Sequence, residues 1–91
     1  MTKFILSSPR IATKMFNSFD DLKSYISEMA KTKYKGQHYN MFGRAFRIED
    51  DTVFHFPYYV DSVVFEDFEG YVTYYIERFN IETNERVDLE D

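Results

Sequence analysis

Residues 60–81 read VDSVVFEDFEGYVTYYIERFNI, and two periodicities compete in this stretch. Its second half is crowded with Tyr, Val, Thr and Ile, which are enriched in β-strands. Apolar residues also recur at spacings of three and four, which would give one long amphipathic helix. Gly70 interrupts that helical stripe, and the β-branched and aromatic composition favours strands. The stretch therefore predicts strands at about 60–65 and 71–81, joined by a turn at 67–70.

One helix is expected upstream, at about 19–34. Ser18 is a suitable N-cap, and Asp20 and Asp21 place carboxylates in the first turn, where the helix dipole favours them. Gly36 is a natural terminator. The apolar residues at helical spacing are Phe19, Leu22, Ile26 and Met29.

The remaining pattern predicts further short strands. Residues 3–7 read as a strand, and residues 10–17 are expected to be irregular. From Met41 onward, Phe42, Phe46 and Ile48 fall at even spacing. A polar turn at 49–52, a strand at 53–56 and a terminal strand at 86–89 follow. The predicted fold is one α+β domain covering residues 1–91, in the order β-α-β-β-β-β. It has a small antiparallel sheet of about four to five strands, with one α-helix packed on one face.

Composition excludes several functional classes. The chain of 91 residues has no Cys, so disulfides and thiolate metal sites are impossible. The only histidines are His38 and His55, and neither lies in a recognisable nucleophile motif. No apolar stretch approaches the ~20 residues of a membrane span. These features predict a non-enzymatic cytoplasmic protein without cofactor, metal or membrane contact. The 10 Phe and 8 Tyr exceed what so small a core can bury, so some rings are expected at the surface.

Charge is divided unevenly along the chain. Residues 1–48 carry nine Lys or Arg against three acids, a balance of +6, whereas residues 49–91 carry two Arg against thirteen acids, a balance of −11. The acidic half predicts a face that binds a protein with a basic surface, because carboxylates steer such an encounter and Tyr supplies contact area. The predicted face consists of Glu49, Asp50, Asp51, Tyr58, Tyr59, Asp61, Glu66, Asp67 and Glu69. The alternative interpretation is a solvated face that keeps the protein soluble.

A second candidate surface lies in the basic segment 31–47. Its cations could neutralise phosphates, and its aromatic rings could stack on unpaired bases. The residues are Lys31, Lys33, Tyr34, Lys35, Tyr39, Arg44 and Arg47, with Phe42 as a third stacking ring. The segment contains no known nucleic-acid-binding signature, and helix C-termini attract Lys in any case.

In length, acidity, aromatic content and lack of Cys, the chain resembles small virus-encoded proteins that inhibit host nucleases, defence complexes or polymerases. The leading hypothesis is thus an acidic protein-binding module, a virus-encoded inhibitor of a host nucleic-acid-binding or defence protein in the host cytoplasm. Such a module would be anti-restriction- or anti-CRISPR-like, with DNA mimicry as one mode. Two alternatives stay open: a single-stranded nucleic-acid-binding module that uses residues 31–47, and a structural subunit whose exposed rings form a homo-oligomer.

Overall fold

Strand β6 (Gly70–Asn80) forms the centre of the sheet, and its side chains alternate between two environments. The computed structural model describes residues 1–49, 56–83 and 85–86. Val72, Tyr74 and Ile76 are buried, whereas Tyr71 and Tyr75 are exposed. This period of two is the pattern of a strand with one covered face. The competing helical interpretation of residues 60–81 is therefore excluded.

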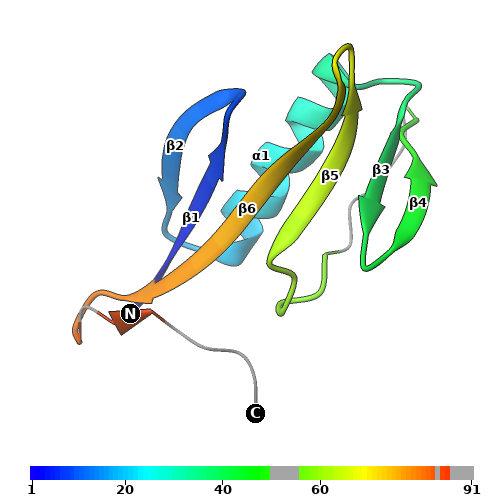
Figure 1. Cartoon of the computed structure of the whole chain (residues 1–91). Helices are drawn as coiled ribbons and strands as arrows, with labels where there is room; N and C mark the ends of the chain where they lie inside the picture. Colours follow the sequence, from blue (N-terminus) through cyan, green and yellow to red (C-terminus); the bar gives the residue numbers. More distant parts are fainter. Residues whose placement is uncertain (50–55, 84, 87–91) are drawn as a thin grey trace.

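The described residues form one antiparallel sheet in the order β2-β1-β6-β5-β3-β4, with β7 paired to β6 (Figure 1). Strands account for 51% of the described residues and the helix for 19%. The elements are β1 (Thr2–Ser8), β2 (Ile11–Phe16), α1 (Phe19–Lys33), β3 (His38–Met41), β4 (Arg44–Arg47), β5 (Ser62–Asp67), β6 and β7 (Glu85–Arg86).

The predicted fold class was wrong. The structure is mostly β, with seven strands in one sheet rather than an α+β domain with four to five strands. Residues 10–17, expected to be irregular, contain β2, which pairs with β1 in a hairpin. The pattern from Met41 onward was read as one strand, but the chain reverses at Phe42 and Gly43 and forms the β3–β4 hairpin. The expected strand at 53–56 lies outside the described residues except for Phe56, as does the expected strand at 86–89 except for Arg86.

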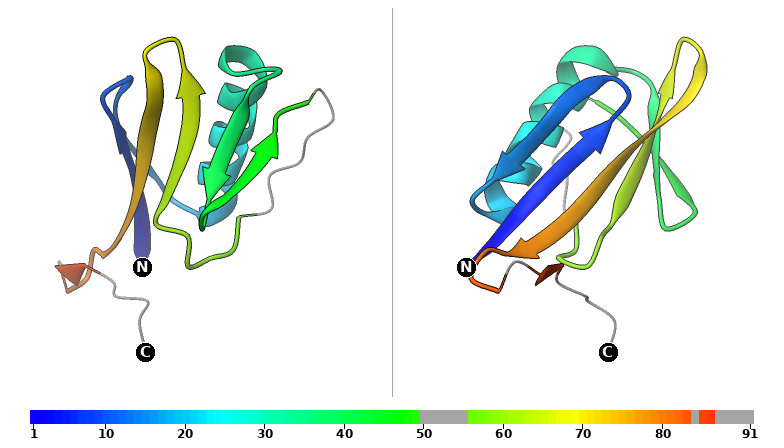
Figure 2. Two further views of the ribbon diagram at one scale, coloured as in Figure 1. Left: turned by 45° about the vertical axis from the view of Figure 1, so that its right-hand side comes forward. Right: turned by 60° about the vertical axis from the view of Figure 1, so that its left-hand side comes forward.

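The predicted helix is confirmed as α1. The Ser18 hydroxyl accepts a hydrogen bond of 3.1 Å from the backbone N–H of Asp21, which satisfies one of the free donors at the helix start. Leu22, Ile26 and Met29 are buried against the sheet. The two views of Figure 2 show that the helix covers one side of the sheet and leaves the other side open. In the described part of the chain, no helix has the length and apolar character needed to cross a membrane.

The core is built largely from rings. Tyr34 stacks on Phe65 with ring centroids 4.7 Å apart, and Phe65 meets Tyr74 edge to face at 5.4 Å. The buried hydroxyls of Tyr34 and Tyr74 lie 2.7 Å apart and form a hydrogen bond with each other. The expectation that some rings remain outside the core is confirmed, because four tyrosines are exposed: Tyr58, Tyr59, Tyr71 and Tyr75.

Candidate partner-binding site

Two tight turns from distant parts of the sequence bring aromatic side chains together at one end of the sheet. Tyr58 and Tyr59 are the central residues of a turn closed by a 3.0 Å hydrogen bond from the N–H of Val60 to the carbonyl of Pro57. Phe42 and Gly43 are the central residues of the turn between β3 and β4. The rings of Phe42 and Tyr59 lie 5.5 Å apart, and the two residues are 56% and 64% exposed. We call Phe42, Tyr58 and Tyr59 the aromatic end.

Phe42 occupies an unfavourable backbone conformation. Its φ is 55°, and that of Gly43 is 75°, which are the values of a type I′ hairpin turn. Asn, Asp or Gly normally occupies the first of these positions, because a side chain with a bulky Cβ substituent clashes in the left-handed region. A Phe there costs stability of about 1–2 kcal/mol. Folding does not require this ring to be exposed at the turn, so the position is a candidate for function.

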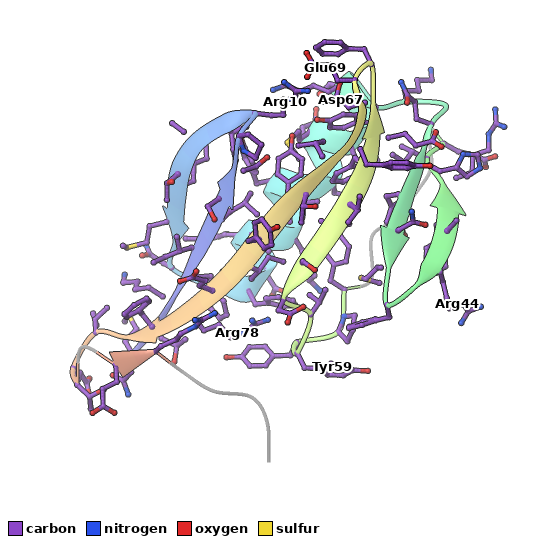
Figure 3. The ribbon with its side chains drawn as sticks, viewed as in Figure 1. Arg10, Arg44, Tyr59, Asp67, Glu69 and Arg78 are labelled. Carbon is purple, nitrogen blue, oxygen red and sulfur yellow. The ribbon has the colours of Figure 1, made fainter. Side chains whose placement is uncertain are left out.

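Arg78 holds the second turn from inside the protein. It lies on the buried side of β6 and is only 3% exposed. Its guanidinium donates to the carbonyl of Tyr58, and at 2.8 Å to the carbonyl of Val60. The ring of Tyr58 lies 5.1 Å from the guanidinium carbon. Arg78 therefore fixes the backbone on both sides of Tyr59 and restrains the turn that presents that ring (Figure 3).

The environment of Arg78 is costly for a cation. Burial lowers its pKa from the ordinary value, and the nearby Tyr58 and Asp61 act in the opposite direction. Its Nε is buried and has no acceptor among the described residues. The rings of Phe4 and Phe19 also flank the guanidinium, at 5.8 and 5.7 Å. Attraction between cation and rings offsets part of the desolvation cost.

The predicted acidic face is divided between the two ends of β5. Tyr58, Tyr59 and Asp61 lie before this strand, whereas Glu66, Asp67 and Glu69 lie at its far end. The five residue steps along the strand from Asp61 to Glu66 separate the groups by roughly 17 Å. Figure 3 shows Tyr59 and Arg78 near one end of the sheet and Asp67 and Glu69 near the other.

Arg10, from the first half of the chain, neutralises part of the far acidic group. Arg10 contacts Asp67 at 2.7 Å and Glu69 at 3.2 Å. His38 Nδ1 lies 3.7 Å from a carboxylate oxygen of Glu66. The charge division along the sequence is thus partly cancelled in space. Glu49 lies beyond β4, 3.8 Å from Arg47, and Asp50 and Asp51 lie outside the described residues.

The basic segment 31–47 is not assembled as a stacking surface. Tyr34 and Tyr39 are only 6% and 7% exposed, and both belong to the core. Tyr39 stacks on Phe46 at 5.1 Å. The predicted cations Lys33, Lys35, Arg44 and Arg47 are exposed, and Lys31 is half-buried at the end of α1. Of the three predicted stacking rings, only Phe42 is exposed, so the segment does not present a row of rings for unpaired bases.

Arg78 was not predicted as a site residue, and Phe42 was predicted only as a stacking ring of the basic segment 31–47. Arg78 had a detectable signal, because Val72, Tyr74, Ile76 and Arg78 follow one another at a period of two. That alternation places a cation on the buried face, which is rare unless the cation has a specific role. The signal for a turn at Phe42 was weaker. It consists of the Gly that follows Phe42, between two short stretches with β-strand composition.

The aromatic end offers a contact surface of exposed rings from two turns. In the described part of the chain, no three His, Asp or Glu residues gather into a group that could hold a metal ion. No protein-family model matches the chain, and neither a curated protein nor a solved structure shows significant similarity to it.

Proposed function

We propose that this protein is a non-enzymatic protein-binding module that holds its partner at the aromatic end. The observation that carries the proposal is the pairing of Phe42 and Tyr59, two exposed rings from separate turns that lie 5.5 Å apart. Aromatic residues on a rigid support dominate the energy of protein interfaces, because they bury a large area with little loss of side-chain freedom. Arg78 supplies that rigidity for the Tyr59 turn.

The charge around the aromatic end favours a basic partner. Asp61 is exposed and directly follows the turn that contains Tyr58 and Tyr59. The ring of Phe19, at the start of α1, lies 5.3 Å from that of Tyr58, so the exposed Asp21 belongs to the same end, as does Asp20, which lies 3.6 Å from the ammonium of Lys23. With the net charge of −5, these carboxylates would attract a basic protein during encounter.

The basic surface of the partner is inferred from that charge, and its class from the compositional resemblance to small virus-encoded inhibitors. We propose a basic, nucleic-acid-binding or defence protein of a host cytoplasm, with this chain as a virus-encoded inhibitor. The proposal does not include DNA mimicry, because Asp67, Glu69 and Glu66 are in contact with Arg10 and His38 and do not form a free row of charges. Occlusion of a basic surface by a compact aromatic contact is sufficient for inhibition.

Affinity capture from an extract of the host cells tests this function. Wild-type protein should retain a partner that Tyr59→Ala and Phe42→Asn lose, each by tenfold or more, since interface rings cost about 2 kcal/mol or more when removed. Phe68→Ala is the matched control, because Phe68 is the most exposed ring, at 84%, and lies at the opposite end of the sheet. Equal loss in all three variants, or loss only in Phe68→Ala, would refute the assignment.

A further inference from the structure

The β3–β5 ladder stops before the aromatic end, and a pocket opens where it stops. The two strands pair at Tyr39 with Phe65 and at Asn40 with Val64. Continuing the register would pair Phe42 with Ser62, but Phe42 has left the strand for its turn. An open pocket of about 540 Å³ lies where Phe42 and Ser62 would have paired. Its lining residues are Asn40, Met41, Phe42, Gly43, Asp61, Ser62 and Val64.

The strand edge inside this pocket presents unpaired backbone groups. The carbonyl of Asp61 accepts a 2.8 Å hydrogen bond from the N–H of Ile76 in β6. Because successive residues of a strand direct their backbone groups to opposite neighbours, the N–H and C=O of Ser62 point toward β3. Among the described residues, β3 supplies no partner for Ser62. The pocket is therefore bordered by a free edge at Ser62.

The lining is rich in hydrogen-bond acceptors and carries a single charge. Asp61 is the only ionisable residue among those that line it. The carbonyl and hydroxyl of Ser62 and the amide oxygen of Asn40 add neutral acceptors. The exposed Phe42, which also lines the pocket, stands against Tyr59 at its border. A ligand that matches these groups has several donors, a positive charge and a flat surface that can lie on a ring.

We propose that this pocket receives an arginine side chain of the protein partner. A guanidinium has five N–H donors in a plane, stacks on aromatic faces and pairs with carboxylates in directed geometry. Among the described residues, Arg44 forms no ion pair with Asp61, and its guanidinium carbon lies 5.7 Å from the ring of Phe46. This inference rests on the proposed function, and it specifies the residue by which the partner is recognised.

NMR titration with a short blocked peptide tests the inference directly. The probe is acetyl-Gly-Arg-Gly-amide, and the matched control replaces Arg with citrulline, which has nearly the same shape without the charge. The Arg peptide should shift the amide signals of Asn40, Gly43 and Ser62, and added salt should weaken binding of the peptide. Equal shifts with citrulline, shifts confined to the β5–β6 turn, or no shifts at millimolar peptide would overturn the inference.

A pair of variants separates charge recognition from a change in folding. Asp61→Asn keeps the shape of the side chain and should weaken binding of the Arg peptide about fivefold, the range expected for a partly exposed ion pair. Glu69→Gln removes a carboxylate at the other end and should leave binding unchanged. Equal affinity of Asp61→Asn and wild type would refute a role for Asp61. Capture of the partner through Tyr59 would still stand if the peptide failed to bind, so the two proposals fail separately.

Discussion

Replacing Arg78 with Met tests how the protein supports its aromatic end. Met keeps an unbranched apolar stem but cannot donate, so the carbonyls of Tyr58 and Val60 lose the guanidinium. A buried acceptor left without its donor costs about 1–3 kcal/mol. Part of that loss is offset, because the variant no longer buries a cation whose Nε has no acceptor among the described residues. We expect the free energy of unfolding to fall by about 2–4 kcal/mol.

Such a loss is large for a domain whose total stability is about 5–15 kcal/mol. It should lower Tm by roughly 10 °C or more, because 1 kcal/mol corresponds to about 4–8 °C at this size. Urea unfolding followed by far-UV circular dichroism measures the difference. Arg86→Met is the control, since Arg86 is exposed on β7. The reasoning is refuted if Arg78→Met costs no more than Arg86→Met, or if it stabilises the protein.

Three further predictions concern the core and the strained turn. Tyr74→Phe should lower the unfolding free energy by about 1–3 kcal/mol, because it leaves the buried hydroxyl of Tyr34 without a partner. The double variant with Tyr34→Phe should lower the unfolding free energy by less than the sum of the two single changes, as measured by urea unfolding. Burial and the hydrogen bond with Tyr34 raise the pKa of Tyr74 in the folded state, so its contribution to stability is complete below about pH 10 and is lost as pH rises further. Stability measured between pH 8 and 11 should fall less steeply for Tyr74→Phe, and an unchanged slope would contradict that role. In a Tyr59→Ala background, Phe42→Asn should raise the unfolding free energy by about 0.5–1 kcal/mol, because Asn tolerates a φ of 55°. A lower unfolding free energy, measured by urea unfolding, would contradict backbone strain at Phe42.

Local signals in the sequence were sufficient for the elements with strong periodicity. The cap at Ser18 and the apolar spacing of α1 predict that helix to within one residue. The β-branched and aromatic composition of residues 71–81 predicts the central strand, which is observed at Gly70–Asn80. Both depend on neighbours in sequence, which single-sequence reasoning can see.

The elements that were missed depend on contacts between distant residues. Strand β2 has mostly exposed side chains and no alternation, so its pairing with β1 defines it. The β3–β4 turn lacks the Asn-Gly or Asp-Gly signal of a tight hairpin, because Phe42 takes the first position. Strand number was therefore underestimated wherever pairing, rather than pattern, determines the strand.

The site was only partly predictable for the same reason. Tyr58, Tyr59 and Asp61 were identified by composition, and they do lie together at one end of β5. The grouping of these residues with Glu66, Asp67 and Glu69 assumed that closeness in sequence implies one surface. A strand between the two groups separates them, and Arg10 reaches the second group from 57 residues away. The contribution of Phe42 required the register of β3 with β4 and β5.

Site-specific photo-crosslinking tests the central claim most directly. The photoreactive residue p-benzoylphenylalanine is placed at position 59 or at position 68 and activated in host cells that produce the protein. Both positions hold exposed rings at turns, on opposite ends of the sheet. We predict one discrete adduct with a different protein from position 59 and none from position 68. Adducts from position 68 alone, equal adducts from both positions, or crosslinking only to a second copy of this chain would contradict partner binding at the aromatic end.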